Sequence, residues 1–81
     1  MNSQAFEIAL AERGIHTTKN LSDVVGISRQ TLTPIRLGKR EPSQETAEQI
    51  RNALGLSELE YRTIFPFQAA VTAVRDKYAP T

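Results

Sequence analysis

Apolar residues recur along the chain at intervals of three or four positions, the spacing that places them on one face of an α-helix. The first such run covers residues 3–13 and the second covers residues 18–25. The positions that we expect to face inward in these two runs are Phe6, Ala9, Leu10, Leu21, Val24 and Val25. Because no segment shows strand-like alternation bounded by turns, the pattern predicts an all-α protein.

Residues that favour helix ends divide the rest of the chain into further short helices. Thr17 and Ser28 are suited to cap the second and third helices, and Ser57 with Glu60 forms a capping-box pattern before a fifth helix at about residue 58. A fourth helix is expected from Pro42-Ser43 to about residue 54. Pro66 can open a sixth helical segment, since proline is tolerated at the first helical position.

The third helix follows the second after a single glycine-containing turn, "VVGIS". Such a turn makes two short helices cross steeply, which is the helix-turn-helix arrangement. In the third helix, Leu32 and Ile35 then face the core, while Arg29, Gln30 and Thr33 face solvent. These exposed side chains can form hydrogen bonds to the edges of DNA bases.

Charge is distributed unevenly along the chain. The 81 residues carry a net charge of only +1, but residues 13–40 hold six basic residues against the single acid Asp23. Residues 1–12 and 41–81 are each net negative. A cationic segment beside a polar helix face favours a polyanion as the partner.

Three stretches, "LSDVVGISRQTL", "I..GKREPS" and "IRNALGLS", together resemble the Cro/phage-repressor type of helix-turn-helix domain, the lambda-repressor-like (XRE) family. The resemblance spans roughly residues 4–61. It implies a compact five-helix domain whose third helix enters the major groove of double-stranded DNA, usually as a homodimer on a near-palindromic site. The protein would then be a sequence-specific transcriptional regulator, a small phage or mobile-element Cro-like repressor.

The resemblance also implies which residues contact DNA. Base readout would fall to Ser28, Arg29, Gln30 and Thr33. Phosphate contacts would fall to Thr18, Lys19, Arg36, Lys39 and Arg40.

Two departures from the family pattern affect the third helix. Pro34 lies in its middle, where proline removes one backbone hydrogen bond, so we expect the helix to kink or to end early and leave readout mainly to Arg29 and Gln30. The family often joins an Arg in helix one to a Glu late in helix three, and those positions are Leu10 and Arg36 here. With both family partners gone, Arg36 would be free to turn outward toward phosphate.

The C-terminal segment 66–81 is interpreted as a helical extension of the 1–65 helix-turn-helix domain, within one domain. Its apolar stripe could pack on the body of the domain or pair with its copy across a two-fold axis, and the second interpretation is preferred. The expected interface residues are Phe65, Phe67, Val71, Val74 and Tyr78.

Other functions find little support in the sequence. There is no cysteine, no cluster with metal-ligand spacing, no catalytic constellation around the single His16 and no apolar run that could cross a bilayer. We therefore expect a cytoplasmic protein that is not an enzyme, with no cofactor, no metal, no membrane and no small-molecule ligand. The alternative is a helix-turn-helix-derived interaction module, a repressor modulator or an antitoxin, which binds another repressor or a toxin and has weak or no specific DNA binding.

Overall fold

The computed structural model describes residues 1–78, which form six α-helices and no strand. The helices are α1 Ser3–Glu12, α2 Thr18–Val25, α3 Arg29–Arg36, α4 Gln44–Leu54, α5 Glu58–Ile64 and α6 Pro66–Tyr78. The predicted all-α class, with five helices and a C-terminal helical segment, is confirmed. Residues 79–81, the last three of the predicted 66–81 extension, lie outside the described residues.

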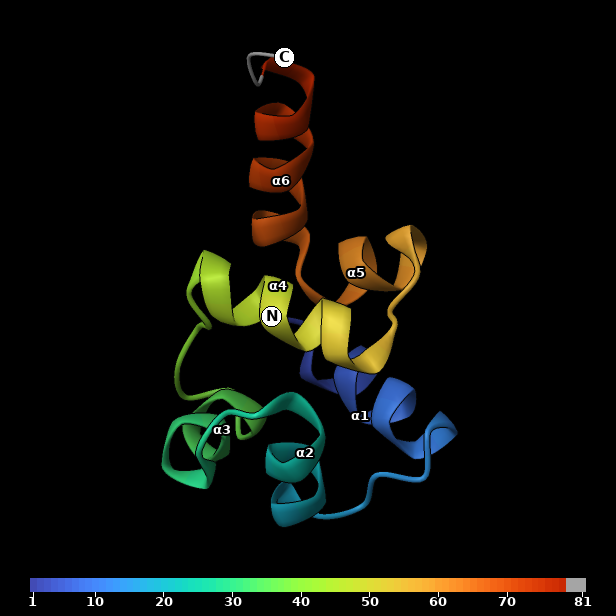
Figure 1. Ribbon diagram of the computed structural model, residues 1–81, viewed down its shortest axis with the longest axis vertical. Helices are drawn as coiled ribbons and strands as arrows, with labels where there is room; N and C mark the ends of the chain where they lie inside the picture. Colours follow the sequence, from blue (N-terminus) through green and yellow to red (C-terminus); the bar gives the residue numbers. More distant parts are fainter. Residues whose placement is uncertain (79–81) are drawn as a thin grey trace.

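The helices are arranged along a body that measures 39 × 23 × 21 Å. Helices α2 and α3 lie together at one end of its long axis, and α6 extends from the other end (Figure 1). Helix α4 crosses the middle, with α1 and α5 on the same central part of the molecule (Figure 1). The helix-turn-helix is thus held at the end of the molecule farthest from the tip of α6.

Short-range hydrogen bonds set the helix boundaries. The side chains of Thr17, Ser28 and Ser57 each accept a hydrogen bond from a backbone N–H three residues further on, as N-caps do. The predicted capping box is present, because Glu60 Oε1 also accepts from the Ser57 N–H over 3.1 Å. At the end of α2, Gly26 adopts a φ of 75°, a left-handed conformation that favours glycine.

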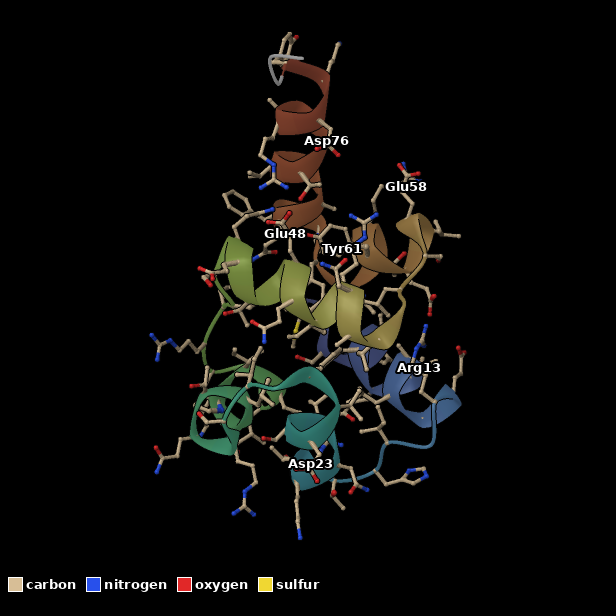
Figure 2. The ribbon with its side chains drawn as sticks, in the orientation of Figure 1. Arg13, Asp23, Glu48, Glu58, Tyr61 and Asp76 are labelled. Atoms are coloured by element: carbon tan, nitrogen blue, oxygen red, sulfur yellow. The ribbon has the colours of Figure 1, made fainter. Side chains whose placement is uncertain are left out.

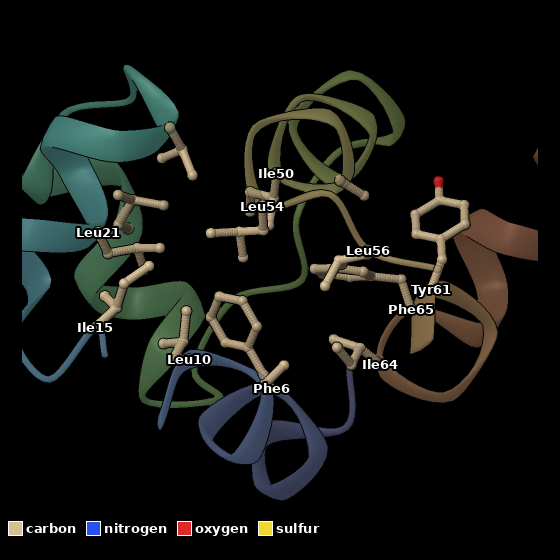
Figure 3. Close-up of a cluster of buried hydrophobic side chains, with 14 of the residues drawn as sticks. Phe6, Leu10, Ile15, Leu21, Ile50, Leu54, Leu56, Tyr61, Ile64 and Phe65 are labelled. Atoms are coloured by element: carbon tan, nitrogen blue, oxygen red, sulfur yellow. The ribbon is translucent and has the colours of Figure 1, made fainter. Parts of the chain in front are cut away.

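Buried side chains from all six helices contribute to the core, most of them from α1, α2, α4 and α5 (Figure 3). The predicted inward positions of the first two helices are buried with one exception, Val24, whose side chain is 49% exposed. The prediction for Val24 is therefore wrong. In a helix as short as α2, Leu21 and Val25, four residues apart, supply the buried contact by themselves, and Val24 lies to one side of them.

Phe65 also belongs to this core and is fully buried. Its ring centroid lies 6.0 Å from that of Phe6 and 5.9 Å from that of Tyr61, so it joins α1 to α5 through a group of three aromatic rings. A buried ring cannot contact a second copy of the chain. The prediction that Phe65 lines a dimer interface is corrected accordingly, and Phe65 is a core residue.

Helix α6 is fastened to the body through polar contacts near its start. Gln44 Nε2 of α4 donates to the Gln68 carbonyl over 3.0 Å and to Thr72 Oγ1 over 2.7 Å. Gln68 Nε2 in turn donates to the Pro42 carbonyl over 2.8 Å, in the segment between α3 and α4. These contacts attach the start of α6 to α4 and to the segment between α3 and α4.

Arg13 links the end of α1 to the other helices of the central part (Figure 2). Its Nε donates to the Leu54 carbonyl over 2.9 Å, and its Nη2 donates to Glu60 Oε1 over 3.1 Å. The Arg13 guanidinium and the Ser57 backbone N–H lower the pKa of Glu60 below its ordinary value. This cation is therefore structural, and it lies away from the end that carries α2 and α3.

Candidate nucleic-acid interface

The turn between α2 and α3 is held from both sides. Ser22 Oγ donates to the Ile27 carbonyl over 2.6 Å, across the turn. From α4, Gln49 Nε2 donates to the Val25 carbonyl over 2.9 Å. Ile27 packs against the core, and Leu32 and Ile35 bury one face of α3. The opposite face of α3 is therefore presented to solvent in a fixed orientation.

The first turn of α3 carries two free polar side chains. Arg29 and Gln30 are both exposed, and within residues 1–78 neither side chain makes a hydrogen bond or an ion pair. Ser28 and Thr33, the other two predicted base-reading residues, are exposed but already use their hydroxyl groups. Ser28 Oγ caps the helix at Thr31 N, and Thr33 Oγ1 donates to the Arg29 carbonyl over 2.8 Å.

Pro34 does not end the helix. Helix α3 continues through it to Arg36, and the next backbone bonds form normally, with Leu37 N donating to the Thr33 carbonyl over 3.0 Å. Lys39 N then donates to the Pro34 carbonyl over 2.9 Å. The proline removes only the one bond that its missing N–H would make to the Gln30 carbonyl. The expectation that the helix ends early is thus incorrect, because the buried contacts of Leu32 and Ile35 hold both sides of the proline in place.

Arg36 does not turn outward. Its Nε donates to Glu7 Oε1 over 2.7 Å and its Nη2 donates to Glu7 Oε2 over 3.0 Å, a two-pronged ion pair between α3 and α1. These hydrogen bonds to the carboxylate raise the pKa of Arg36 above its ordinary value. Arg36 Nη1 also donates to Thr18 Oγ1 over 3.2 Å, at the start of α2. The guanidinium holds three segments together, and the prediction of a phosphate contact by Arg36 is corrected.

The ion pair that the family often forms between an Arg in helix one and a Glu in helix three is therefore present here with the two charges exchanged. The acid is Glu7, one helical turn before Leu10, and the base is Arg36. The sequence did not predict this pair, because only Leu10 was compared with the position of the family's arginine. Glu7 lies three residues earlier on the same side of α1, and a search over that turn would have found it.

The other predicted phosphate contacts lie around α3. Lys19 at the start of α2, and Lys39 and Arg40 after α3, are exposed, and within residues 1–78 their side chains form no ion pair. Thr18 is half-buried, and its hydroxyl accepts the hydrogen bond from Arg36. Asp23 lies at the same end of the molecule (Figure 2). With Arg29, four cations that form no ion pair within residues 1–78 therefore lie on α2, on α3 and in the loop after α3.

Comparison with protein families identifies a match to the helix-turn-helix family model over residues 9–61. The chain belongs to this family, in its lambda-repressor-like form, whose members are DNA-binding transcription regulators. The matched residues include the helix-turn-helix and the exposed cations Lys19, Lys39 and Arg40, and they end before α6. No curated protein matches the chain, and no solved structure matches it.

Neither a metal-binding group nor a membrane-spanning helix is found among the described residues. In residues 1–78, no group of three or more His, Asp or Glu side chains is placed to hold a metal ion. Over the same residues, no helix combines the length and the hydropathy needed to cross a bilayer.

Lys39 provides a test of the phosphate-binding loop. Replacing Lys39 with alanine is expected to weaken binding to all duplex sequences by the same factor, because phosphate contacts carry no sequence information directly. The slope of log K against log salt concentration is expected to become shallower by about 0.9, the value for a single phosphate that the protein no longer neutralises. Fluorescence anisotropy over a salt series measures both quantities. Weaker binding to one sequence alone would contradict the assignment.

Proposed function

We propose that this protein is a small Cro-like repressor that binds a near-palindromic operator as a homodimer and acts without a cofactor. The observation that carries the proposal is the pair Arg29 and Gln30, exposed and unpaired at the first turn of α3 and flanked by the free cations Lys19, Lys39 and Arg40. In this arrangement the first turn of α3 enters the major groove and the cations contact phosphates on either side.

The exposed face of α6 supports a dimer. Phe67, Val74 and Tyr78 are 73%, 57% and 71% exposed, and Val71 between them is 39% exposed. Four large apolar side chains on one face of one helix form a patch of the kind that marks a protein interface. A second copy of the chain would cover this patch with its own α6.

The positions of α6 and α3 restrict how such a dimer is built. The two helices lie toward opposite ends of the long axis (Figure 1). Two copies joined end to end through α6 would point their α3 helices away from each other. To place both α3 helices on one side of a duplex, about 34 Å apart, the copies must lie side by side with their long axes roughly parallel.

The proposed mechanism is occlusion of a promoter. Two α3 helices in successive major grooves are centred about half a turn of DNA on either side of the dyad, and the bound dimer prevents polymerase from using the same site. Repressor concentration, competition for the operator or a partner protein would then control the outcome. A phage or mobile-element origin is part of this proposal, since the sequence resembles the Cro/phage-repressor type of helix-turn-helix domain.

The exposed α6 face also supports the second candidate, a helix-turn-helix protein whose main partner is another protein, such as a repressor or a toxin. In that case Phe67, Val71, Val74 and Tyr78 would contact the partner, and specific DNA binding would be weak or absent. A proline that disrupted α3 would favour this candidate, but α3 continues through Pro34 to Arg36.

Selection from randomised duplex DNA at near-physiological salt distinguishes the two candidates. We expect the purified protein to enrich a two-fold-symmetric site, and we expect the double variant Arg29→Ala/Gln30→Ala to lose that enrichment while it keeps its helical circular-dichroism spectrum. If the wild-type protein enriches no sequence and binds only weakly and with strong salt dependence, the repressor proposal is wrong and the protein-interaction candidate replaces it.

A further inference from the structure

The exposed face of α3 changes character along its length. Its first turn carries Arg29 and Gln30, but the residues that follow on the same side offer apolar groups. The Thr33 hydroxyl donates to the Arg29 carbonyl, so its methyl group is the part of the side chain that is left for a contact. Pro34 is half-buried and has no polar side-chain atom. Leu37 is 64% exposed, directly after the helix.

Helical geometry places Leu37 on the base-reading face. Leu37 has φ −78° and ψ −2°, within the right-handed helical region, so the helical spacing of side chains extends to it. Gln30, Thr33 and Leu37 are separated by three and four residues, and residues at these intervals are neighbours on one face of a helix. The buried residues Leu32 and Ile35 occupy the opposite face.

We propose that Leu37, together with the ring of Pro34, contacts the 5-methyl group of a thymine in the major groove and so selects a T·A pair in the same half-site as the pair read by Arg29 or Gln30. The inference rests on the proposed DNA binding and assigns part of its sequence preference. Among the groups that the major groove presents, the thymine methyl is the apolar one, and apolar side chains contact it.

The surroundings of Leu37 favour DNA over a protein as the partner that contacts its side chain. The side chain lies on the same helix face as Gln30, and after Gly38 the chain continues with the exposed cations Lys39 and Arg40. An exposed leucine on a helix face bordered by free cations is continuous with a surface suited to a polyanion. A protein partner for an apolar face would be expected at α6, at the other end of the molecule (Figure 1).

The test removes the methyl group and nothing else from the DNA. In the duplex enriched by selection, each thymine is replaced in turn by deoxyuridine, and the dissociation constant is measured by fluorescence anisotropy. Burial of one methylene-sized group is worth about 0.8 kcal/mol, which corresponds to about a fourfold change in affinity. We therefore expect about fourfold weaker wild-type binding at one thymine position of each half-site and no change at the others.

Two leucine variants make the assignment specific. Leu37→Ala is expected to reduce the difference between the thymine and deoxyuridine duplexes at that position to well below fourfold, because only the ring of Pro34 then remains to contact the methyl group. The matched control is Leu59→Ala, because Leu59 is 66% exposed on α5, outside the candidate interface. Leu59→Ala is expected to keep the fourfold difference. Both side chains are largely exposed, so neither substitution removes core packing.

Each remaining outcome overturns the inference. If wild-type protein enriches a site but binds all its deoxyuridine versions equally, no methyl group is read, although the proposed repressor function stands. If Leu37→Ala keeps the fourfold difference, another side chain reads the methyl group. If no sequence is enriched at all, the proposed function fails and this inference fails with it.

Discussion

Replacing Phe65 with alanine is expected to lower the free energy of unfolding by about 3–5 kcal/mol, the usual cost of deleting a buried aromatic side chain. Phe65 is fully buried and its ring contacts the rings of Phe6 and Tyr61 (Figure 3). A domain of this size has a total stability of only several kcal/mol. The variant should therefore be largely unfolded at moderate urea concentrations, as measured by circular dichroism.

The matched control is Phe67→Ala, two residues further along the chain. Phe67 is 73% exposed, so its removal should change the unfolding free energy of the monomer by no more than about 0.5 kcal/mol. The same variant should weaken self-association in sedimentation equilibrium, if the α6 face forms the proposed dimer. Equal destabilisation by the two variants at low protein concentration would contradict the separation of core and interface between these neighbouring residues.

Replacing Arg29 with alanine is expected to weaken binding to the selected duplex by about 1–3 kcal/mol, or about 5- to 150-fold. Arginine commonly reads guanine through two hydrogen bonds, and their removal should also relax discrimination at one base pair. Because the exposed Arg29 side chain has no partner within residues 1–78, its removal should leave the unfolding free energy nearly unchanged. Fluorescence anisotropy with the selected duplex measures the affinity, and a repeated selection with the variant measures the preference.

The control for this prediction is Arg62→Ala. Arg62 is an exposed arginine on α5, away from the end of the molecule that carries α2 and α3. Its replacement removes the same charge from the protein and should leave the preferred sequence as it is, with at most a small decrease in affinity. An Arg29→Ala variant with an unchanged preferred site would exclude Arg29 from base readout.

The helices of this protein could be predicted from the sequence because local interactions set their boundaries. Thr17, Ser28 and Ser57 cap helices through hydrogen bonds to residues three positions away. The helix-turn-helix followed from the same kind of information, since Gly26 and the spacing of Leu21, Leu32 and Ile35 lie within one short stretch. The exposure of Arg29 and Gln30 follows from which face of α3 is apolar.

The tertiary structure alone decided the contacts between distant segments. Arg36 and Glu7 are 29 residues apart, and their pairing depends on how α3 lies against α1. Phe65 and Phe67 are similar in the sequence, but Phe65 is buried and Phe67 exposed, because Gln44 and Gln68 hold α6 in one orientation. Capping and helical periodicity act over three or four residues and can be seen in the sequence, whereas burial and ion pairing depend on the packing of whole helices.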